Sequence, residues 1–550
     1  MFTQDRDFVW WKHGIIYQIY PRSFYDSNGD GIGDLPGIIS KLDYLSELGI
    51  DAIWLSPINR SPMYDFGYDI SDYREIDPVF GSGQDCINLI EECHRREIRV
   101  ILDLVFNHTS HLHPWFVESR SSLDNPKRDW YIWHEGVSGR APNNWKAAFG
   151  GGAWEWDETT GQYYLHSFLR EQPDLNWRNR EVREALYNEA RYWLDLGIDG
   201  FRLDVVNWFI KDDRFRSNPF GLGPTPRPYD LQKHIYDRNR PEIHDVLKEF
   251  RSVLDEYDDR MAVGEAYSPP PGDVVMSASC LGQGNDQLHL SFDFTLLYSK
   301  LGADNFIRAI HDWLRLLPEK GWPCHVLSNH DQPRSLTRYG KNHDRTAMAK
   351  VLAALLLTVK GTPFIYYGEE IGMTDGRIRR KEIQDPVGIR YWPLNTGRDP
   401  ARTPMQWTGD AYAGFSSVKP WLPVNRDFTE FNVLNQVEDS GSILNFYRNL
   451  IALRRKEPVL QQGDWFPVNT GLNLIAYYRK KNNDRIFVVL NISSSETSIS
   501  ESNQGIWEVI FGTHKIMGDI FTDLRFSIHP YEVLILKKKV RGARYHRKVL

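Results

Sequence analysis

Short runs of β-branched and aromatic residues alternate with helix-like segments over most of this chain. Such alternation is typical of βα units, in which a helix returns the chain to the same edge of a parallel sheet. One helix is clear, because apolar residues between Ile38 and Leu48 recur at helical spacing and Gly49 follows as a stop signal. Eight units would close into a TIM-type (β/α)8 barrel. The expected strands are 15–20, 52–55, 100–105, 201–205, 262–266, 290–294, 325–327 and 364–367.

Two long stretches depart from this alternation. Residues 109–177, rich in tryptophan and with three glycines at 150–152, show little periodicity and indicate an inserted, loop-rich subdomain after strand 3. Beyond residue 461, alternating runs predict antiparallel strands at 474–479, 486–490, 507–510 and 533–536. We therefore predict an α/β fold with a barrel at 1–108 and 178–460, an inserted subdomain at 109–177, a C-terminal antiparallel β-domain at 461–536 and a solvated basic tail at 537–550.

Charge, the N-terminus, the apolar stretches and the cysteines limit the partners and the location that we expect. The formal net charge of -7 gives no reason to expect nucleic acid or an anionic membrane as a partner. The N-terminus lacks the pattern of a signal peptide, and the longest apolar stretch, 351–359, is too short to span a bilayer. We expect a cytoplasmic monomer or homodimer. Four scattered cysteines are expected to be reduced thiols: Cys86, Cys93, Cys280 and Cys324.

Four segments, 103–108, 200–204, 263–265 and 328–331, end in residues that suit the cleavage of a glycosidic bond. Each follows or contains a short apolar run, so each places a carboxylate or imidazole at the C-terminal end of a strand, where TIM barrels build active sites. Any single one could be a structural ion pair. The whole set, with three acids from three strands beside an arginine and two histidines, favours a retaining glycosidase.

The three acids have distinguishable settings. Asp204 suits the nucleophile, because Arg202 lies two residues earlier on the same face of the strand and favours the ionised carboxylate. Glu265 suits the acid/base, because it ends an apolar run that would raise its pKa. Asp331 would stabilise positive charge at the anomeric carbon, with His108 and His330 as hydrogen-bond donors to the same sugar ring.

Nearly the whole chain resembles the α-amylase superfamily of glycoside hydrolases, and it is most similar to the branch of α-glucosidases and oligo-1,6-glucosidases. Besides the four segments above, the resemblance rests on YQIYPRSF at 17–24, GYDISDY at 67–73, QPDLNW at 172–177 and RTPMQW at 402–407. It implies that Asp204 is the nucleophile, Glu265 the acid/base and Asp331 the stabiliser of the transition state.

The same resemblance implies sugar-binding roles. Asp65 and Arg402 match a pair that grips the non-reducing glucose and closes the pocket behind it, and Tyr68 matches the ring on which that glucose stacks. A closed pocket implies exo action on short α-glucosides. The other residues implied to bind or line the sugar are His108, Arg202, His330, Phe149, Phe168 and Gln172.

A calcium loop is predicted at 26–34. Oxygen-bearing side chains at alternate positions, with glycines between them, suit Ca²⁺ binding, although the twelfth position is Gly37, so the loop is not an EF-hand. An Asn/Gly-rich turn without an ion is the alternative. The resemblance implies a structural Ca²⁺ or Mg²⁺ bound by Asp26, Asn28, Asp30, the carbonyl of Ile32 and Asp34. No organic cofactor is expected, because neither glycine cluster, at 81–83 or 150–152, has a phosphate-binding fingerprint.

Linkage preference is indicated by Val205, which follows the expected nucleophile, and less clearly by residues 206–219, which look more like those of α-glucosidases with broader specificity. In the resembling family, valine at this position goes with α-1,6 cleavage, so Val205 leans slightly towards isomaltose-type substrates, and such a contact is worth about 1–3 kcal/mol. The leading hypothesis is a retaining exo-α-glucosidase that acts on maltose-, isomaltose- or sucrose-type substrates and can also transfer the glucosyl group. The alternatives are a glucosyl-transferring isomerase of the trehalose-synthase or sucrose-isomerase kind, and a non-catalytic carbohydrate-binding homologue.

Overall fold

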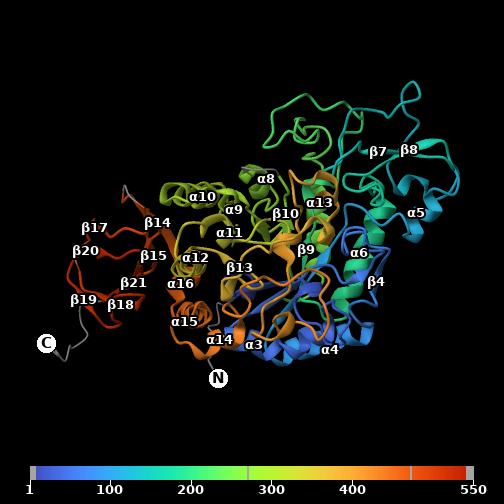
Figure 1. Cartoon of the computed structure of the whole chain (residues 1–550). Helices are drawn as coiled ribbons and strands as arrows, with labels where there is room; N and C mark the ends of the chain where they lie inside the picture. The colour runs from blue at the N-terminus through green and yellow to red at the C-terminus, as the bar shows by residue number, and fades with distance from the viewer. Residues whose placement is uncertain (1–7, 269–271, 471–472, 504, 540–550) are drawn as a thin grey trace.

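The computed structural model describes residues 8–268, 272–470, 473–503 and 505–539 (Figure 1). Eight parallel strands form a closed barrel and follow one another around it in chain order, as successive βα units do. The predicted TIM fold with a C-terminal antiparallel sheet is confirmed. The barrel strands are β1 (Ile16–Ile19), β2 (Ala52–Leu55), β5 (Arg99–Leu104), β9 (Gly200–Leu203), β10 (Met261–Glu265), β11 (Leu290–Phe292), β12 (Cys324–Val326) and β13 (Thr362–Tyr366).

Helices connect and cover these strands. The expected helix before Gly49 is two helices, α2 (Leu35–Ser40) and α3 (Leu42–Leu48), because Lys41 leaves the helical conformation between them. Gly49 ends α3 at a φ of 91°, which suits glycine. The other helices are α1 (Trp10–His13), α4 (Gly83–Arg95), α5 (Pro114–Ser119), α6 (Arg180–Asp195), α7 (Ile243–Leu254), α8 (Val274–Ser279), α9 (Thr295–Tyr298), α10 (Ala303–Leu316), α11 (Ser335–Tyr339), α12 (Arg345–Thr358), α13 (Pro386–Tyr391), α14 (Val433–Glu438), α15 (Ile443–Lys456) and α16 (Pro458–Gln462).

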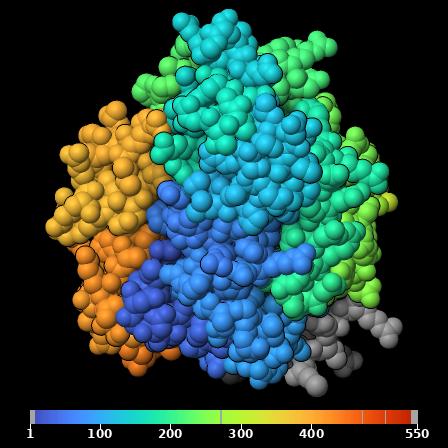
Figure 2. All heavy atoms as spheres, turned by 90° about the vertical axis from the view of Figure 1, so that its right-hand side faces the viewer, coloured from blue at the N-terminus to red at the C-terminus, as the bar shows by residue number. Residues whose placement is uncertain are grey.

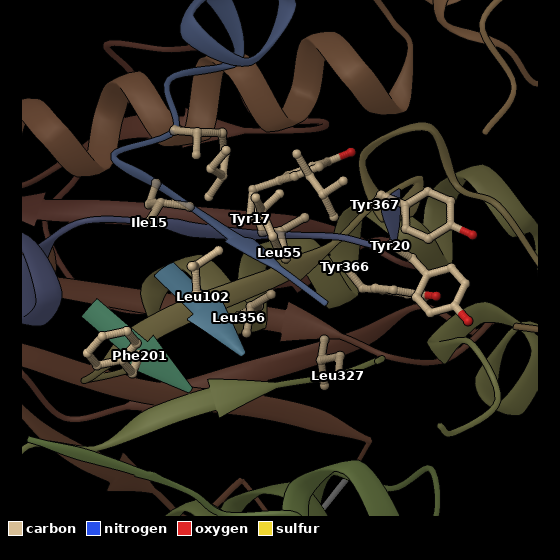
Figure 3. Close-up of a cluster of buried hydrophobic side chains, with 14 of the residues drawn as sticks. Ile15, Tyr17, Tyr20, Leu55, Leu102, Phe201, Leu327, Leu356, Tyr366 and Tyr367 are labelled. Atoms are coloured by element: carbon tan, nitrogen blue, oxygen red, sulfur yellow. The ribbon is translucent and has the colours of Figure 1, made fainter. Parts of the chain in front are cut away.

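Side chains of the barrel strands alternate between two apolar layers, as the period of a strand requires. One layer fills the barrel and includes Ile101 of β5 and Val263 of β10. The other lies between barrel and helices and includes Leu102 of β5, Phe201 of β9 and Leu356 of α12, which are labelled in Figure 3. Counting on by two from the inner positions shows that Asp103 and Glu265 point inward, and Arg202, which lies opposite Asp103 in the β5–β9 register, does the same. The alternation therefore delivers charged groups to the mouth of the barrel.

The inserted subdomain follows β5 and lies at the opposite end of the molecule from the C-terminal sheet (Figure 1). It contains α5 and a three-stranded antiparallel sheet of β6 (Trp133–His134), β8 (Gln162–Leu165) and β7 (Trp154–Asp157), so it has more regular structure than the sequence indicates. A bridge between His108 and Asp174 ties its end to the C-terminal end of β5. A hairpin of β3 (Asn59–Arg60) and β4 (Asp72–Ile76) follows β2.

The C-terminal β-domain contains a six-stranded and a two-stranded sheet. Strand β21 runs past the expected end at residue 536, and Lys537 binds Glu457 at 2.7 Å, so the first residues of the expected basic tail belong to the sheet. Residues 540–550 of that tail, like the N-terminal residues 1–7, lie outside the described part. The strands are β14 (Asp464–Val468), β15 (Leu474–Lys481), β16 (Asp484–Asn491), β18 (Trp507–Gly512), β19 (Ile520–Phe521) and β21 (Val533–Lys538), with β17 (Thr497–Glu501) and β20 (Leu524–Ile528) as the pair.

Two further expectations concern the state of the cysteines and the length of the apolar helices. Cys86 and Cys93 lie on one helix, α4, and all four cysteines are buried and free. Over the described ranges, none of the helices is long and apolar enough to cross a membrane.

Candidate active site

One buried guanidinium links the acids at the barrel mouth. Arg202 Nη1 donates to Asp204 Oδ1 at 2.6 Å and to Asp103 Oδ1 at 2.8 Å, while its Nη2 binds Glu265. Carboxyl groups held by one guanidinium lie within a few ångströms of each other, which is compatible with the roughly 5–5.5 Å separation of a retaining pair. Three strands, β5, β9 and β10, thus bring the predicted nucleophile and acid/base together.

Burial shifts Glu265 and Asp103, two acids that Arg202 binds, towards the protonated form. Burial raises the pKa of Glu265 to about 8, and the nearby charge of Asp204 adds to that rise while Arg202 opposes it. Burial likewise raises the pKa of Asp103 to about 7, against the pull of Arg202. A glutamic acid that keeps its proton near neutral pH can donate it, which is what a general acid must do.

Asp331 has the opposite setting. Burial favours its neutral form, but His330 and the guanidinium groups of Arg398 and Arg402 outweigh burial and hold the pKa of Asp331 below its usual range. Arg402 Nη2 donates to Asp331 Oδ1 at 2.8 Å, and its Nε donates to the carbonyl of His330 at 2.7 Å. Asp331 therefore stays ionised, as a group that stabilises positive charge must.

Asp65 binds an arginine that the sequence analysis did not name. Asp65 Oδ1 accepts from Arg398 Nη2 at 2.6 Å, and the same nitrogen donates to Asp385 at 2.6 Å, whereas Arg402 binds Asp331. The expected grip of Asp65 and Arg402 on the non-reducing glucose stays a prediction. Arg398 and Arg402 both lie at the 3-10 turn 398–402, with Arg398 capping it, and only Arg398 reaches Asp65. Sequence reasoning missed Arg398 because it lies just before the RTPMQW motif.

Five predicted sugar ligands, Asp65, Tyr68, His108, Gln172 and His330, are connected by hydrogen bonds. Tyr68 Oη lies 2.7 Å from His330 Nε2 and donates to Asp103 at 3.1 Å, and its ring stacks on that of His330 at an interplanar angle of 3°. Gln172 Nε2 donates to Asp65 Oδ2 at 3.1 Å and lies 3.1 Å from His108 Nε2. Burial lowers the pKa of both histidines, so they act as neutral hydrogen-bonding groups.

Val205, next to Asp204, adopts a left-handed conformation with a φ of 39°. A β-branched residue at positive φ is strained and persists only where the surroundings impose it, which is a common property of functional sites. Val205 is 4% exposed and packs with Phe168 and Trp208 beside the pocket. The left-handed residue changes the direction of the chain after β9, and both Asp204 and Val205 line the pocket.

These groups surround a cavity of about 410 Å³, a size that suits a small sugar. Nine predicted residues line it: Asp65, Tyr68, His108, Phe149, Phe168, Asp204, Val205, Glu265 and Asp331. Gln172, Arg202, His330 and Arg402 lie behind this lining and bind its members, and their sugar-binding roles stay predictions. Lining residues that the sequence analysis missed come mostly from irregular loops, and include Pro224, Thr225, Arg227, Tyr267, Gln332, Val387, Asn395, Thr396 and Arg398.

A buried ion pair supports the wall of the cavity. Lys211 Nζ lies 2.7 Å from Asp174 Oδ2 and donates to Asn107 Oδ1 at 2.9 Å, and the side chains of Lys211 and Asp174 are almost wholly buried. Asp174 also accepts from the backbone of Ser167 at 3.0 Å and from Asn107. The pair therefore fastens the segment that carries Phe168 to the end of β5.

The loop at 26–34 is folded around its own carboxylates. Asp26 accepts backbone N–H groups of Gly29 at 2.7 Å and Gly31 at 2.8 Å and the hydroxyl of Ser416 at 2.6 Å. Asp34 caps α2 through Gly37 N at 2.6 Å. The donor chemistry suits Ca²⁺, yet these oxygens accept hydrogen bonds, and within the part of the chain that is described no three His, Cys, Asp or Glu residues are grouped as metal ligands. The ion remains a prediction.

The barrel, the inserted subdomain and the three acids define a class of enzyme, and residues 18–463 match the family model "Alpha amylase, catalytic domain". The chain belongs to the alpha-amylase family, and it is a glycoside hydrolase. It is 45% identical to a probable alpha-glucosidase of Rhizobium meliloti (strain 1021), over 89% of this chain and 90% of the relative. It is 42% identical to an oligo-1,6-glucosidase of Parageobacillus thermoglucosidasius, over 88% of this chain and 91% of the relative.

Solved structures agree with this placement. A variant of the isomaltulose synthase of Erwinia rhapontici NX5, in complex with its natural substrate sucrose, superposes with a TM-score of 0.89 at 36% identity, over 97% of this chain and 100% of that one. These similarities support glucosidase activity on small glucosides and disfavour a non-catalytic binding protein.

Proposed function

We propose that this protein is a retaining exo-α-glucosidase that releases glucose from the non-reducing end of short α-glucosides. The observation that carries the proposal is the fork of Arg202, which holds Asp204 and Glu265 together while burial keeps the pKa of Glu265 at about 8. The guanidinium of Arg202 binds one acid, Asp204, and the other acid, Glu265, keeps a proton, which is the division that a retaining mechanism requires.

In the first step, Asp204 attacks the anomeric carbon while Glu265 gives its proton to the departing glycosidic oxygen. The bond to the leaving group breaks, and a glucosyl ester forms on Asp204. Asp331 stabilises the positive charge that develops on the ring. In the second step, Glu265 takes a proton from water, the water oxygen attacks the anomeric carbon, and Asp204 leaves as a carboxylate. Two inversions at one carbon give net retention.

Exo action follows from the closed end of the pocket. Asp65 and Arg398 join across it, so bound glucose meets a wall where a further sugar unit would have to extend. The lining guanidinium groups are already paired, Arg398 with Asp65 and Asp385 and Arg227 with Asp230 at 2.9 Å. A pocket whose cations are neutralised favours an uncharged sugar over a phosphorylated one.

Val205 and the oligo-1,6-glucosidase relatives support a slight lean towards α-1,6 linkages. A glucosyl-transferring isomerase is the second candidate, because solved structures of similar fold include trehalulose synthase and isomaltulose synthase. In that case the glucosyl ester would pass to a hydroxyl of the departing sugar and not to water.

Product analysis separates these possibilities. Purified protein is incubated separately with maltose, isomaltose, sucrose and trehalose, and the products are resolved by chromatography. Free glucose, released faster from isomaltose than from maltose, is the expected result. A preference for maltose or sucrose would keep the mechanism and remove the lean from Val205, and a new disaccharide with little glucose would assign the isomerase.

We also propose a structural Ca²⁺ or Mg²⁺ at Asp26, Asn28, Asp30, the Ile32 carbonyl and Asp34. The support is the donor set, with oxygen ligands at alternate positions of one short turn, and not an observed coordination geometry. The ion would hold the loop and take no part in catalysis.

A further inference from the structure

The three glycines at 150–152 belong to a tight turn in the inserted subdomain that reaches the pocket. The backbone N–H of Gly150 donates to the carbonyl of Ala147 at 2.9 Å, and that of Ala148 donates to the carbonyl of Ser167 at 2.9 Å. The tip of this turn presents Ala148 and Phe149 to the cavity. The ring of Phe149 packs on Phe168, with ring centroids 5.4 Å apart.

Two arginines from the segment after β13 hold this turn from opposite sides. On the pocket side, the guanidinium of Arg398 lies over the ring of Phe149 at 4.7 Å. On the outer side, Arg390 Nη1 at the end of α13 donates to the carbonyl of Gly150 at 2.9 Å. In Figure 2 the inserted subdomain (cyan to teal) and the segment after β13 (yellow to orange) lie side by side on one face of the molecule.

A side chain added at the turn would push against the ends of the Arg390 and Tyr391 side chains. Gly150 has a φ of +103°, and a Cβ placed there would lie 2.2 Å from Tyr391 Oη and 2.9 Å from Arg390 Nε. Gly151, with a φ of +93°, would bring its Cβ to 3.2 Å from Arg390 Nη2. Glycine at 150 is therefore needed both for the backbone conformation and for the close approach of α13.

We propose that Arg390 and Tyr391 act as a clasp that closes the pocket wall and positions Phe149 against the glucosyl ring of the substrate. The clasp residues touch the turn and not the substrate, so they are positioning residues. The wall formed by Phe149 borders the part of the pocket that holds the glucosyl unit, which all substrates share. The clasp should therefore affect binding of the glucosyl unit equally for every leaving group. This inference rests on the proposed glucosidase function.

The test compares Arg390→Ala with wild type by steady-state kinetics on maltose, isomaltose and p-nitrophenyl α-glucoside. Loss of the clasp should raise KM about two- to tenfold, the effect of one net hydrogen bond, with kcat nearly unchanged. The factor should be the same for all three substrates. Arg390→Lys, which keeps a donor, should restore most of the loss. Unchanged KM in Arg390→Ala, or a rise that depends on the leaving group, would overturn the proposal.

Two matched controls separate the clasp from general effects on the fold. Gly139→Ala introduces the same kind of backbone strain in the same subdomain, at a φ of +72°, but a Cβ there meets nothing within 4 Å. Gly150→Ala should raise KM strongly and Gly139→Ala should not, and equal KM values for the two would contradict the clasp. Arg180→Ala removes an exposed arginine on α6 and controls for charge.

A failure of the proposed function itself would look different. In that case wild type would release no glucose from any of the three substrates. Binding of a glucose-configured iminosugar, measured by calorimetry, would then still report on the clasp, because Arg390→Ala should weaken it by the same two- to tenfold factor.

Discussion

Replacement of Lys211 by methionine tests how the wall of the pocket is held. The ammonium group lies 2.7 Å from Asp174 and both side chains are almost wholly buried. At that distance the attraction is about 6 kcal/mol with an effective dielectric constant of about 20, and desolvation of the two charges offsets part of it. Removal of one partner from a buried pair costs about 3–5 kcal/mol. Asp174 would keep its bonds from Ser167 and Asn107, so we expect about 3 kcal/mol.

This loss should appear in thermal unfolding followed by calorimetry. With an unfolding entropy of about 2.1 cal/mol/K per residue over 550 residues, the loss of about 3 kcal/mol should lower Tm by roughly 2–3 °C. The KM for maltose should rise too, because Asp174 fastens the segment that carries Phe168. Lys233→Met, on the same long loop but exposed, is the control and should change neither quantity.

A double variant identifies the cause. Lys211→Met combined with Asp174→Asn leaves no buried charge, so it should be more stable than Lys211→Met alone. The reasoning would be refuted if Lys211→Met unfolded at the temperature of wild type, or if the second substitution lowered stability further.

Three other predictions follow from the site. Because Glu265 must hold a proton and its pKa is about 8, kcat/KM should fall as pH rises above about 8. Folding raises the pKa of Glu265, so the stability that its protonated form contributes is lost as pH rises towards 8. Glu265→Gln should therefore unfold at a higher temperature than wild type at pH 9 but not at pH 4. Equal unfolding temperatures at pH 9 would contradict the raised pKa. Removal of divalent ions by chelation should lower Tm more than it lowers turnover at room temperature. Elemental analysis should find about one Ca²⁺ or Mg²⁺ per chain. An ion-free protein with unchanged Tm would favour the turn without an ion. Arg398→Met removes the partner of Asp65 and should raise KM by roughly two orders of magnitude in Michaelis kinetics. Arg402→Met should mainly lower kcat, because Arg402 binds Asp331. The reverse pattern would contradict the pairing of Arg398 with Asp65 and of Arg402 with Asp331.

The barrel and its acids could be predicted because strand periodicity is local. Alternation along β5 and β10 places Asp103 and Glu265 on inward positions without any knowledge of the partner strands. The fork of Arg202 then follows, since a parallel barrel brings β5, β9 and β10 into register at one end. Asp204 could be placed because it comes directly after β9, one residue beyond its end.

Contacts between loops could not be predicted in the same way. Asp65 and Arg398 are separated by more than three hundred residues, and both lie in irregular segments, so no periodicity relates them. The segment after β13 reaches the pocket at two places, through Arg398 and through Arg390, and its sequence shows neither. The glycine run at the Gly150 turn can be recognised in the sequence, but its neighbours, the side chains of Arg390 and Tyr391, come from a distant helix.

The central claim is that Asp204 forms a covalent bond with the glucosyl unit. It is tested most directly by treating the protein with a slow fluorinated α-glucosyl fluoride, digesting it and locating the adduct by mass spectrometry. We expect one glucosyl adduct on the peptide that contains Asp204, none in Asp204→Asn, and α-glucose as the first product observed by NMR. An adduct on Glu265 or Asp331, or β-glucose as the first product, would contradict the account.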